Sequence, residues 1–288
     1  MPSAAYQHVI DHRDEYTWVG HLFGDSRPRG FALGKFEDDP TDPLDPAHPL
    51  WAFRSPSSMA NWALSHNNRP ERFVYAGAID AENIAWRISQ GTIRPNDVVI
   101  LSDAGFVTSG AEAYYTWLKE ARTAVVQSGI RCVMATTPDY LAAGANEPAQ
   151  FDLVHCNGSL DSGTLNDMIR RAATWGADAV AANGVMYPTW GRTHLIDLNA
   201  IIDSKRASAL AQDGVDLFRN DRIHENVWGQ MRWVMQHMAA CGLRQYTTDV
   251  TPLQDLAAAN WEFLGYGSTD PDWNASRART YVAMLRAP

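Results

Sequence analysis

The stretch Tyr16–Pro28, with the sequence YTWVGHLFGDSRP, predicts a strand that ends in a tight turn. Its first part, Tyr16–Phe23, is rich in aromatic and β-branched residues, which suits a buried strand. Gly24 allows a backbone conformation that other residues resist, and the Asp-Ser pair after it favours the start of a helix. Pro28 fits the first turn of such a helix, because a missing N–H costs nothing there. We therefore expect a strand, a turn and a helix over these residues.

Ser26 is thereby expected at the carboxyl end of a strand and beside the start of a helix. A serine in that position is well placed as a nucleophile, and its own N–H can help to hold an oxyanion. The tripeptide Gly-Asp-Ser also occurs in many ordinary turns, so by itself it does not separate a turn from an active site.

Strands and helices alternate along the rest of the chain. Expected strands lie at 72–77, 98–103, 131–138 and 194–198, and expected helices at 57–66, 81–90, 112–127, 164–175 and 226–241. A short strand is also expected at 177–182, after a helix stop at Gly176. The spacing fits βαβ units and predicts a parallel sheet with helices on both faces. Ligands bind beyond the carboxyl ends of such strands, where Ser26, Gly77 and the pair Ser102-Asp103 are expected.

The composition limits the classes of protein that the chain can belong to. The 288 residues are 45% hydrophobic, which is enough for one large α/β domain or two small ones. The formal charge of -9 disfavours a general nucleic-acid-binding surface, because such a surface needs a basic patch. No apolar run approaches the roughly 20 residues that a membrane span needs. Met1–Glu15 is polar and shows no secretory signal, so we expect a cytoplasmic protein or one exported by a route not encoded here.

Neither the cysteines nor the histidines predict a metal site, and no cofactor is expected. The three cysteines are odd in number and widely spaced, which argues against a disulfide framework, and Cys132 is expected as a buried thiol in a strand. No Cys-x-x-Cys or His-Glu-x-x-His pattern occurs. The histidines considered as metal ligands are scattered along the chain: His48, His66, His155 and His237.

A second informative pattern is Asp221-Arg222-Ile223-His224, just before the last expected core helix. The spacing of Asp221 and His224 lets a carboxylate reach Nδ1 of the imidazole and leaves Nε2 facing outward. The carboxylate then fixes the tautomer, and Nε2 accepts the proton of a serine. The alternative is a surface Asp-x-x-His that caps a helix, and the spacing alone does not decide between the two.

Three motifs together resemble the SGNH (GDSL-type) hydrolases: Gly24-Asp25-Ser26, then Gly77 after the second strand, then Asp221-Arg222-Ile223-His224. Their order along the chain matches that family, and the resemblance covers roughly residues 18–242. It implies a flavodoxin-like three-layer α/β/α sandwich with a central parallel sheet. We therefore expect residues 1–244 to form the hydrolase domain. The tail looks partly helical at 253–263 and 276–285, so we expect 245–288 to be a helical extension of that domain.

The same resemblance assigns roles to particular residues. Ser26 is the expected nucleophile, His224 the base and Asp221 the acid that orients it. The N–H groups of Ser26 and Gly77 are the expected donors of the oxyanion hole. The family's third motif usually reads Gly-x-Asn-Asp and supplies an asparagine donor, but here the run is Leu101-Ser102-Asp103-Ala104-Gly105. Ser102 is the expected replacement, and Asn157 or Asn183 are alternatives. Losing such a donor can cost on the order of 3 kcal/mol of transition-state stabilisation.

The function that follows is a serine esterase that forms an acyl-enzyme on Ser26. The expected partner is a small-molecule or carbohydrate ester. The eleven tryptophans, whose flat faces suit sugars, and the lack of a long apolar lid favour an O-acetylated carbohydrate, although most of these tryptophans are expected in the core. Two alternatives stay open: an acyltransferase that uses the same site, and a catalytically degenerate SGNH-fold binding or structural protein.

Overall fold

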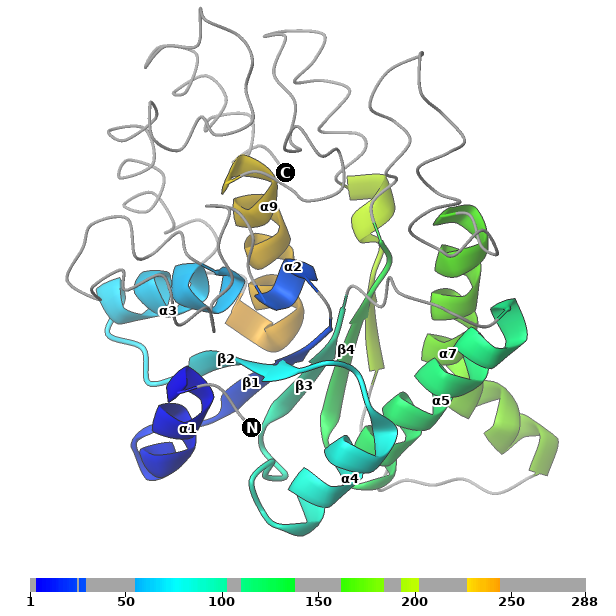
Figure 1. The fold of residues 1–288 in the computed structure, drawn as a ribbon, viewed down its shortest axis with the longest axis horizontal. Helices are drawn as coiled ribbons and strands as arrows, with labels where there is room; N and C mark the ends of the chain where they lie inside the picture. Colours follow the sequence, from blue (N-terminus) through cyan, green and yellow to red (C-terminus); the bar gives the residue numbers. More distant parts are fainter. Residues whose placement is uncertain are drawn as a thin grey trace, which may run out of the picture.

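A parallel sheet lies at the centre of the molecule (Figure 1). The computed structural model describes residues 4–24, 26–29, 55–102, 110–137, 162–183, 193–201 and 227–243. Within these ranges the strands are β1 (Val19–Phe23), β2 (Arg72–Gly77), β3 (Val98–Leu101), β4 (Arg131–Ala135) and β5 (Thr193–Ile196). All four pairings are parallel, and the strand order is β2-β1-β3-β4-β5. This is the order 2-1-3-4-5 of flavodoxin-like folds, which confirms the expected fold class.

Helices connect the strands and cover the sheet. Within the described ranges they are α1 (Ala4–Asp11), the 3-10 turn η1 (Arg13–Glu15), α2 (Ser26–Arg29), α3 (Pro56–His66), α4 (Ala81–Ser89), α5 (Ala111–Gln127), α7 (Ser162–Asn183), α9 (Val227–Met238) and the π-type turn η4 (Ala239–Leu243) that follows α9.

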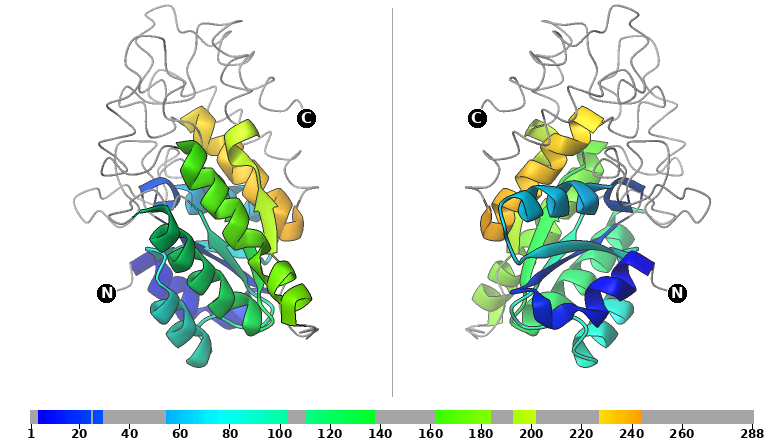
Figure 2. Two further views of the ribbon diagram at one scale, coloured as in Figure 1. Left: turned by 90° about the vertical axis from the view of Figure 1, so that its right-hand side faces the viewer. Right: turned by 90° about the vertical axis from the view of Figure 1, so that its left-hand side faces the viewer.

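The core has a layer on each face of the sheet. On one face Val99 and Leu101 of β3 pack with buried side chains of α1, α4, α5 and α7. The alternate residues Val98 and Ile100 are equally buried and point the other way, as successive side chains of a strand do. On that second side α3 packs against α9 and β2. Figure 2 shows α5 and α9 on opposite sides of the sheet, so the arrangement is the expected three layers.

The outer edge of β2 is covered by an asparagine side chain. Asn61 of α3 accepts a hydrogen bond from the Phe73 N–H at 2.7 Å and donates to the Phe73 carbonyl at 2.8 Å. The amide side chain thus satisfies backbone groups that an edge strand would otherwise leave free. It also ties α3 to the strand that ends at Gly77.

One predicted strand is wrong. The chain does not form a strand at 177–182, because α7 continues through Gly176 to Asn183. The sequence after Gly176 is Ala-Asp-Ala-Val-Ala-Ala, and alanine is the strongest helix former. A single glycine inside a helix costs only about 1 kcal/mol relative to alanine, so it did not stop the helix.

The amino-terminal region differs from expectation in two ways. The polar segment before Tyr16, for which no helix was predicted, forms α1 and η1. The strand begins at Val19 rather than Tyr16, because the carbonyls of Tyr16 and Thr17 bind side chains. Arg13 Nη1 donates to the Tyr16 carbonyl at 2.8 Å, and Asn96 Nδ2 donates to the Thr17 carbonyl at 2.5 Å.

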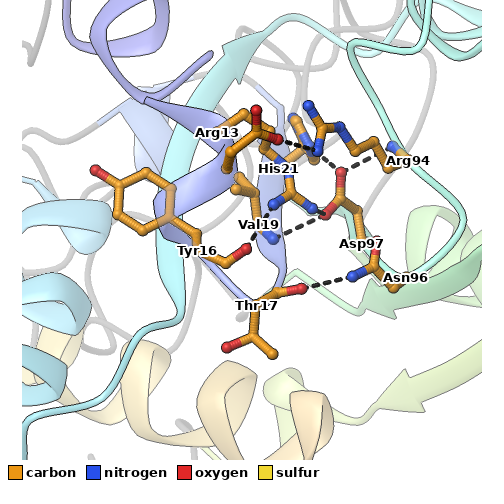
Figure 3. Close-up of polar contacts among 9 residues, drawn as sticks. Arg13, Tyr16, Thr17, Val19, His21, Arg94, Asn96 and Asp97 are labelled. Atoms are coloured by element: carbon orange, nitrogen blue, oxygen red, sulfur yellow. Dashed lines mark hydrogen bonds and ion pairs between the residues drawn. The ribbon is translucent and has the colours of Figure 1, made fainter. Parts of the chain in front are cut away.

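A buried ionic cluster fastens this amino-terminal region to the sheet (Figure 3). Asp97, at the start of β3, accepts hydrogen bonds from the Arg13 guanidinium, from the Val19 N–H at 2.9 Å and from His21 Nε2 at 3.1 Å. The Arg94 N–H adds a fourth at 2.8 Å. Burial opposes ionisation of Asp97, but the hydrogen bonds from His21, Arg94 and Val19 outweigh it and hold the pKa of the carboxyl below its usual value.

The expected extension at 245–288 lies outside the described residues and stays a prediction. Among the helices that the structure describes, none has both the length and the apolar character needed to cross a bilayer.

Candidate active site

The structure brings the carboxyl ends of three neighbouring strands together, as the sequence predicted. Phe23, the last residue of β1, pairs with Gly77 of β2 on one side and with Leu101 of β3 on the other. Gly24 therefore lies between Gly77 and Ser102. The turn that carries Ser26 starts from this point.

Backbone hydrogen bonds continue the sheet one step beyond β1. The Gly24 N–H donates to the Gly77 carbonyl, and the Ser102 N–H donates to the Phe23 carbonyl, each at 3.0 Å. The peptide group between Phe23 and Gly24 is thus bound on both sides. This fixes where the turn toward Ser26 leaves the sheet.

Gly24 is required for space. A Cβ at this position would lie 1.8 Å from the Ser102 carbonyl oxygen and 2.6 Å from Cγ of Pro28. The sequence predicted a glycine here for its conformational freedom, but the φ of Gly24 does not fall in the left-handed region. A glycine is needed here because the backbone of β3 and the ring of Pro28 approach so closely.

Gly77 is the glycine whose conformation matters. Its φ is +123°, a value that side-chain-bearing residues rarely adopt, and a Cβ there would meet no atom within 4 Å. The pairing of β1 with β2 shifts at this point: Leu22 faces Tyr75, but Phe23 faces Gly77. Ala76 is therefore the extra residue of a β-bulge, a device that often re-aims residues beside active sites.

Ser102 is buried, with 1% of its surface exposed, immediately after β3. Its Oγ has no hydrogen-bond partner in the structure as described. A hydroxyl can donate one hydrogen bond and accept two, and leaving it unpaired inside a protein is unfavourable. Ser102 therefore holds an unused donor at the edge of the sheet where the sequence placed the oxyanion hole.

The remaining predicted site residues are only partly within the described ranges. Ser26 begins α2, but nothing beyond its backbone is described. Asp25, Asp103, Asp221 and His224 lie outside the described residues, as does Asn157. Asn183 ends α7 and its side chain is likewise not described.

The start of α9 gives the nearest described point to the Asp-x-x-His motif. The helix begins at Val227, three residues after His224. Figure 1 shows its first turn on the same side of the sheet as α2. The helices α2 and α9 both have α3 as a neighbour. The chain thus enters α9 on the carboxyl-end side, where Ser26 begins its helix.

A feature that the sequence reasoning missed lies after β4. Asn166 of α7 accepts a hydrogen bond from the Thr137 N–H at 2.8 Å and donates to the Thr137 carbonyl at 2.9 Å. Asn166 is buried beside Leu165, on the apolar side of its helix. A polar amide at such a position was the available signal. The hydroxyl of Thr137, like that of Ser102, has no partner among the described groups.

The cysteines within the described ranges are poor rivals for the role of nucleophile. Burial raises the pKa of the Cys132 thiol to about 12 and that of Cys241 to about 12. The reactive thiolate is therefore scarce at neutral pH. Cys132 is the buried thiol that the sequence predicted, and Cys156 lies outside the described residues.

No three His, Cys, Asp or Glu side chains gather into a possible metal site in the described part of the chain. Its tryptophans are mainly packing residues. Trp18 meets the ring of Phe73 edge-on with centroids 5.6 Å apart, and Trp233 stacks on His237 at 3.5 Å. Trp86 of α4 is the exception, with 60% of its surface exposed.

No model of a known protein family matches the chain, and no curated protein sequence matches it. Several solved structures are similar to it. BT4096, a gut microbial diltiazem-metabolizing enzyme, is 16% identical with a TM-score of 0.46, over 79% of this chain and 47% of the other. This chain thus spans about half the length of BT4096.

Two further structures match nearly over their whole lengths. LAE5, an alpha/beta hydrolase enzyme from the metagenome of Lake Arreo, Spain, is 18% identical with a TM-score of 0.46, over 79% of this chain and 96% of the other. Axe2, an acetylxylan esterase from Geobacillus stearothermophilus, is 14% identical with a TM-score of 0.42, over 79% and 95%.

Proposed function

We propose that the protein is a serine hydrolase that cleaves carboxylic esters through an acyl-enzyme on Ser26. The observation that carries the proposal is the frame at the carboxyl ends of β1, β2 and β3. There, the Phe23–Gly24 peptide is bound by backbone hydrogen bonds to Gly77 on one side and to Ser102 on the other, where the chain turns toward Ser26. Polar groups converge at the edge of a parallel sheet where ligands bind.

The proposed reaction has two halves. Ser26 Oγ attacks the ester carbonyl carbon while His224 Nε2 takes the serine proton, and Asp221 orients the imidazole. The tetrahedral intermediate then collapses, and His224 gives the proton to the departing alcohol. Water attacks the acyl-enzyme in the same way, with His224 again as base, and releases the carboxylic acid and free Ser26.

The oxyanion of each intermediate needs donors that are already in place. We assign this task to the N–H groups of Ser26 and Gly77 and to the hydroxyl of Ser102. Support for Ser102 comes from its burial and from its unused donor. An oxyanion beside this hydroxyl would provide the partner that the ground state lacks, so the hydrogen bond would form mainly in the transition state.

For the substrate we propose an O-acetylated carbohydrate as the first class to test. The chemical reason is the chain's eleven tryptophans, whose flat indole faces suit sugars. The tryptophans whose side chains the structure does not describe are the candidates for contacting the sugar: Trp51, Trp190, Trp228, Trp261 and Trp273.

The test compares the protein with Ser26→Ala on p-nitrophenyl acetate and on acetylated oligosaccharides. We expect hydrolysis by the unaltered protein, no acyl-enzyme in Ser26→Ala, and labelling of Ser26 by a fluorophosphonate probe, located by peptide mass spectrometry. Adding a sugar acceptor shows whether the acyl group passes to water or to a hydroxyl. Equal hydrolysis by the two proteins would rule out Ser26 as the nucleophile.

The missing asparagine of the third motif favours one other function, a binding protein built on the same fold. An intact protein that neither hydrolyses these esters nor reacts with the fluorophosphonate, but binds acetylated oligosaccharides in calorimetry, would establish that alternative.

A further inference from the structure

The turn that carries the proposed nucleophile, residues 24–26, begins where the backbone hydrogen bonds of the sheet end. The Phe23–Gly24 peptide is bound by β2 and β3, as described above. The carbonyl of the next residue, Gly24, has no backbone donor among the described residues. Because Gly24 has no side chain, its backbone torsions are the least restricted in the turn.

A tyrosine side chain binds this carbonyl. The Tyr75 hydroxyl donates a hydrogen bond to the Gly24 carbonyl oxygen at 3.2 Å. Tyr75 is half-buried in β2 and is the last residue before the bulge at Ala76. The strand thus supplies two contacts to Gly24: the Gly77 carbonyl holds its N–H, and the Tyr75 hydroxyl holds its C=O.

The two contacts together restrict how Gly24 can turn. Its N–H lies before Cα and its carbonyl after Cα, so the two torsions between them, φ and ψ, are both restrained by contacts to one strand. The chain continues from that carbonyl through Asp25 to the N–H of Ser26. A rotation at Gly24 would displace both the serine and the first donor of the oxyanion hole.

We propose that Tyr75 is a positioning residue: by binding the Gly24 carbonyl, it orients the turn that presents Ser26. This inference rests on the proposed function for its effect on the reaction. Tyr75 acts through Gly24 and has no part in bond making. The close approach of Ser102 requires a glycine at position 24, and a glycine restricts its own backbone torsions less than a larger residue would. The hydrogen bond from Tyr75 supplies the missing restriction.

The test is Tyr75→Phe, which keeps the ring and removes the hydroxyl. We expect amide hydrogen exchange at Gly24 to accelerate by about tenfold or more, because its N–H is held in the same frame. With p-nitrophenyl acetate we expect kcat to fall about tenfold while KM stays within about twofold, since misplacing a reacting group affects the chemical step. The rate of fluorophosphonate labelling should fall with kcat.

The matched control is Tyr16→Phe. Tyr16 is also half-buried, but it precedes β1 at the opposite end of the strand, with the Arg72 guanidinium 5.1 Å from its ring centroid. This variant should leave both Gly24 exchange and kcat as they are. Thermal unfolding of both variants separates a general loss of stability from a local one, because a merely structural role would lower the melting temperature without changing kcat of the folded protein.

Two results would overturn the inference. Unchanged exchange at Gly24 in Tyr75→Phe would show that the hydroxyl does not hold the turn, whatever the activity. Faster exchange with an unchanged kcat would show that the turn needs no such support. If the unaltered protein and Ser26→Ala hydrolyse esters equally, the proposed function fails instead, and exchange at Gly24 still shows whether Tyr75 orders the turn.

Discussion

Replacing Ser102 by alanine should move activity and stability in opposite directions. The hydroxyl is buried without a partner, which for a neutral group costs about 1–3 kcal/mol. Ser102→Ala removes that cost along with one small atom, and the backbone bond from Ser102 N–H to Phe23 remains available. We therefore expect the free energy of unfolding to rise by about 1 kcal/mol, at the lower end of that range.

The effect on the reaction follows from the same hydroxyl. If it donates to the oxyanion, its removal should lower kcat by roughly 10²-fold, which corresponds to about 2.7 kcal/mol of transition-state stabilisation. KM should change little, because the hydrogen bond forms mainly after the attack on the carbonyl. Stability gained at the expense of activity is typical of strained functional sites.

The assay combines urea unfolding, followed by tryptophan fluorescence, with steady-state hydrolysis of p-nitrophenyl acetate. Ser55→Ala is the matched control, because Ser55 is an equally buried serine whose Oγ accepts from the Ser58 N–H at 3.1 Å and caps α3. That variant should lose about 1 kcal/mol of stability. A Ser102→Ala protein that is less stable and keeps its full kcat would refute the reasoning on both counts.

Three further predictions concern the frame and the core. Asp97→Ala leaves the Arg13 guanidinium, 4% exposed, without its counter-ion and should cost about 3–5 kcal/mol of unfolding free energy in urea titrations, with the double variant Arg13→Met/Asp97→Ala recovering part of it; equal losses in the single and double variants would contradict this. Burial lowers the pKa of His237 from 6.5 to about 3, so its contribution to stability is present above pH 6.5 and is lost as the pH falls toward 3. Unfolding free energies of His237→Phe should therefore decline less between pH 7 and pH 5 than those of the unaltered protein, and equal slopes would count against this source. Gly24→Ala should either fail to fold or give a soluble protein without measurable ester hydrolysis, because the new Cβ would lie 1.8 Å from the Ser102 carbonyl oxygen. A variant with the circular dichroism spectrum and the kcat of the unaltered protein would exclude that clash.

The sheet could be predicted because its signals are local. The apolar run Val98–Leu101 and the alternating strands and helices each lie within a few residues of sequence. The carboxyl ends of the strands follow from the same pattern, which is why Gly77 and Ser102 were expected at them. Where a local signal conflicted with another, as between Gly176 and the alanines after it, helix propensity prevailed.

The contacts that fasten the fold could not be predicted, because they join residues far apart. Arg13 and Asp97 are separated by 84 positions, and nothing near either residue indicates the other. The same holds for Asn61 and Phe73, and for Asn166 and Thr137, where one amide side chain takes the place of a strand. Pairings of this kind follow from the assembled layers and leave no periodic pattern in the sequence.

The turn at residues 24–26 depends both on a local sequence signal and on contacts between distant residues. Gly-Asp-Ser marks the place of Ser26 in the sequence, yet the frame around it consists of backbone groups, whose hydrogen bonds do not depend on residue type. Gly24 has the residue type expected, but for a different reason, since the carbonyl of Ser102 requires the empty space. The side chain of Tyr75 also binds this turn, through its hydrogen bond to the Gly24 carbonyl. Tyr75 lies outside the Gly-Asp-Ser motif, so the motif does not reveal this contact. On the proposed function, the motif names the residue that reacts, and contacts such as the one from Tyr75 decide how well that residue is oriented.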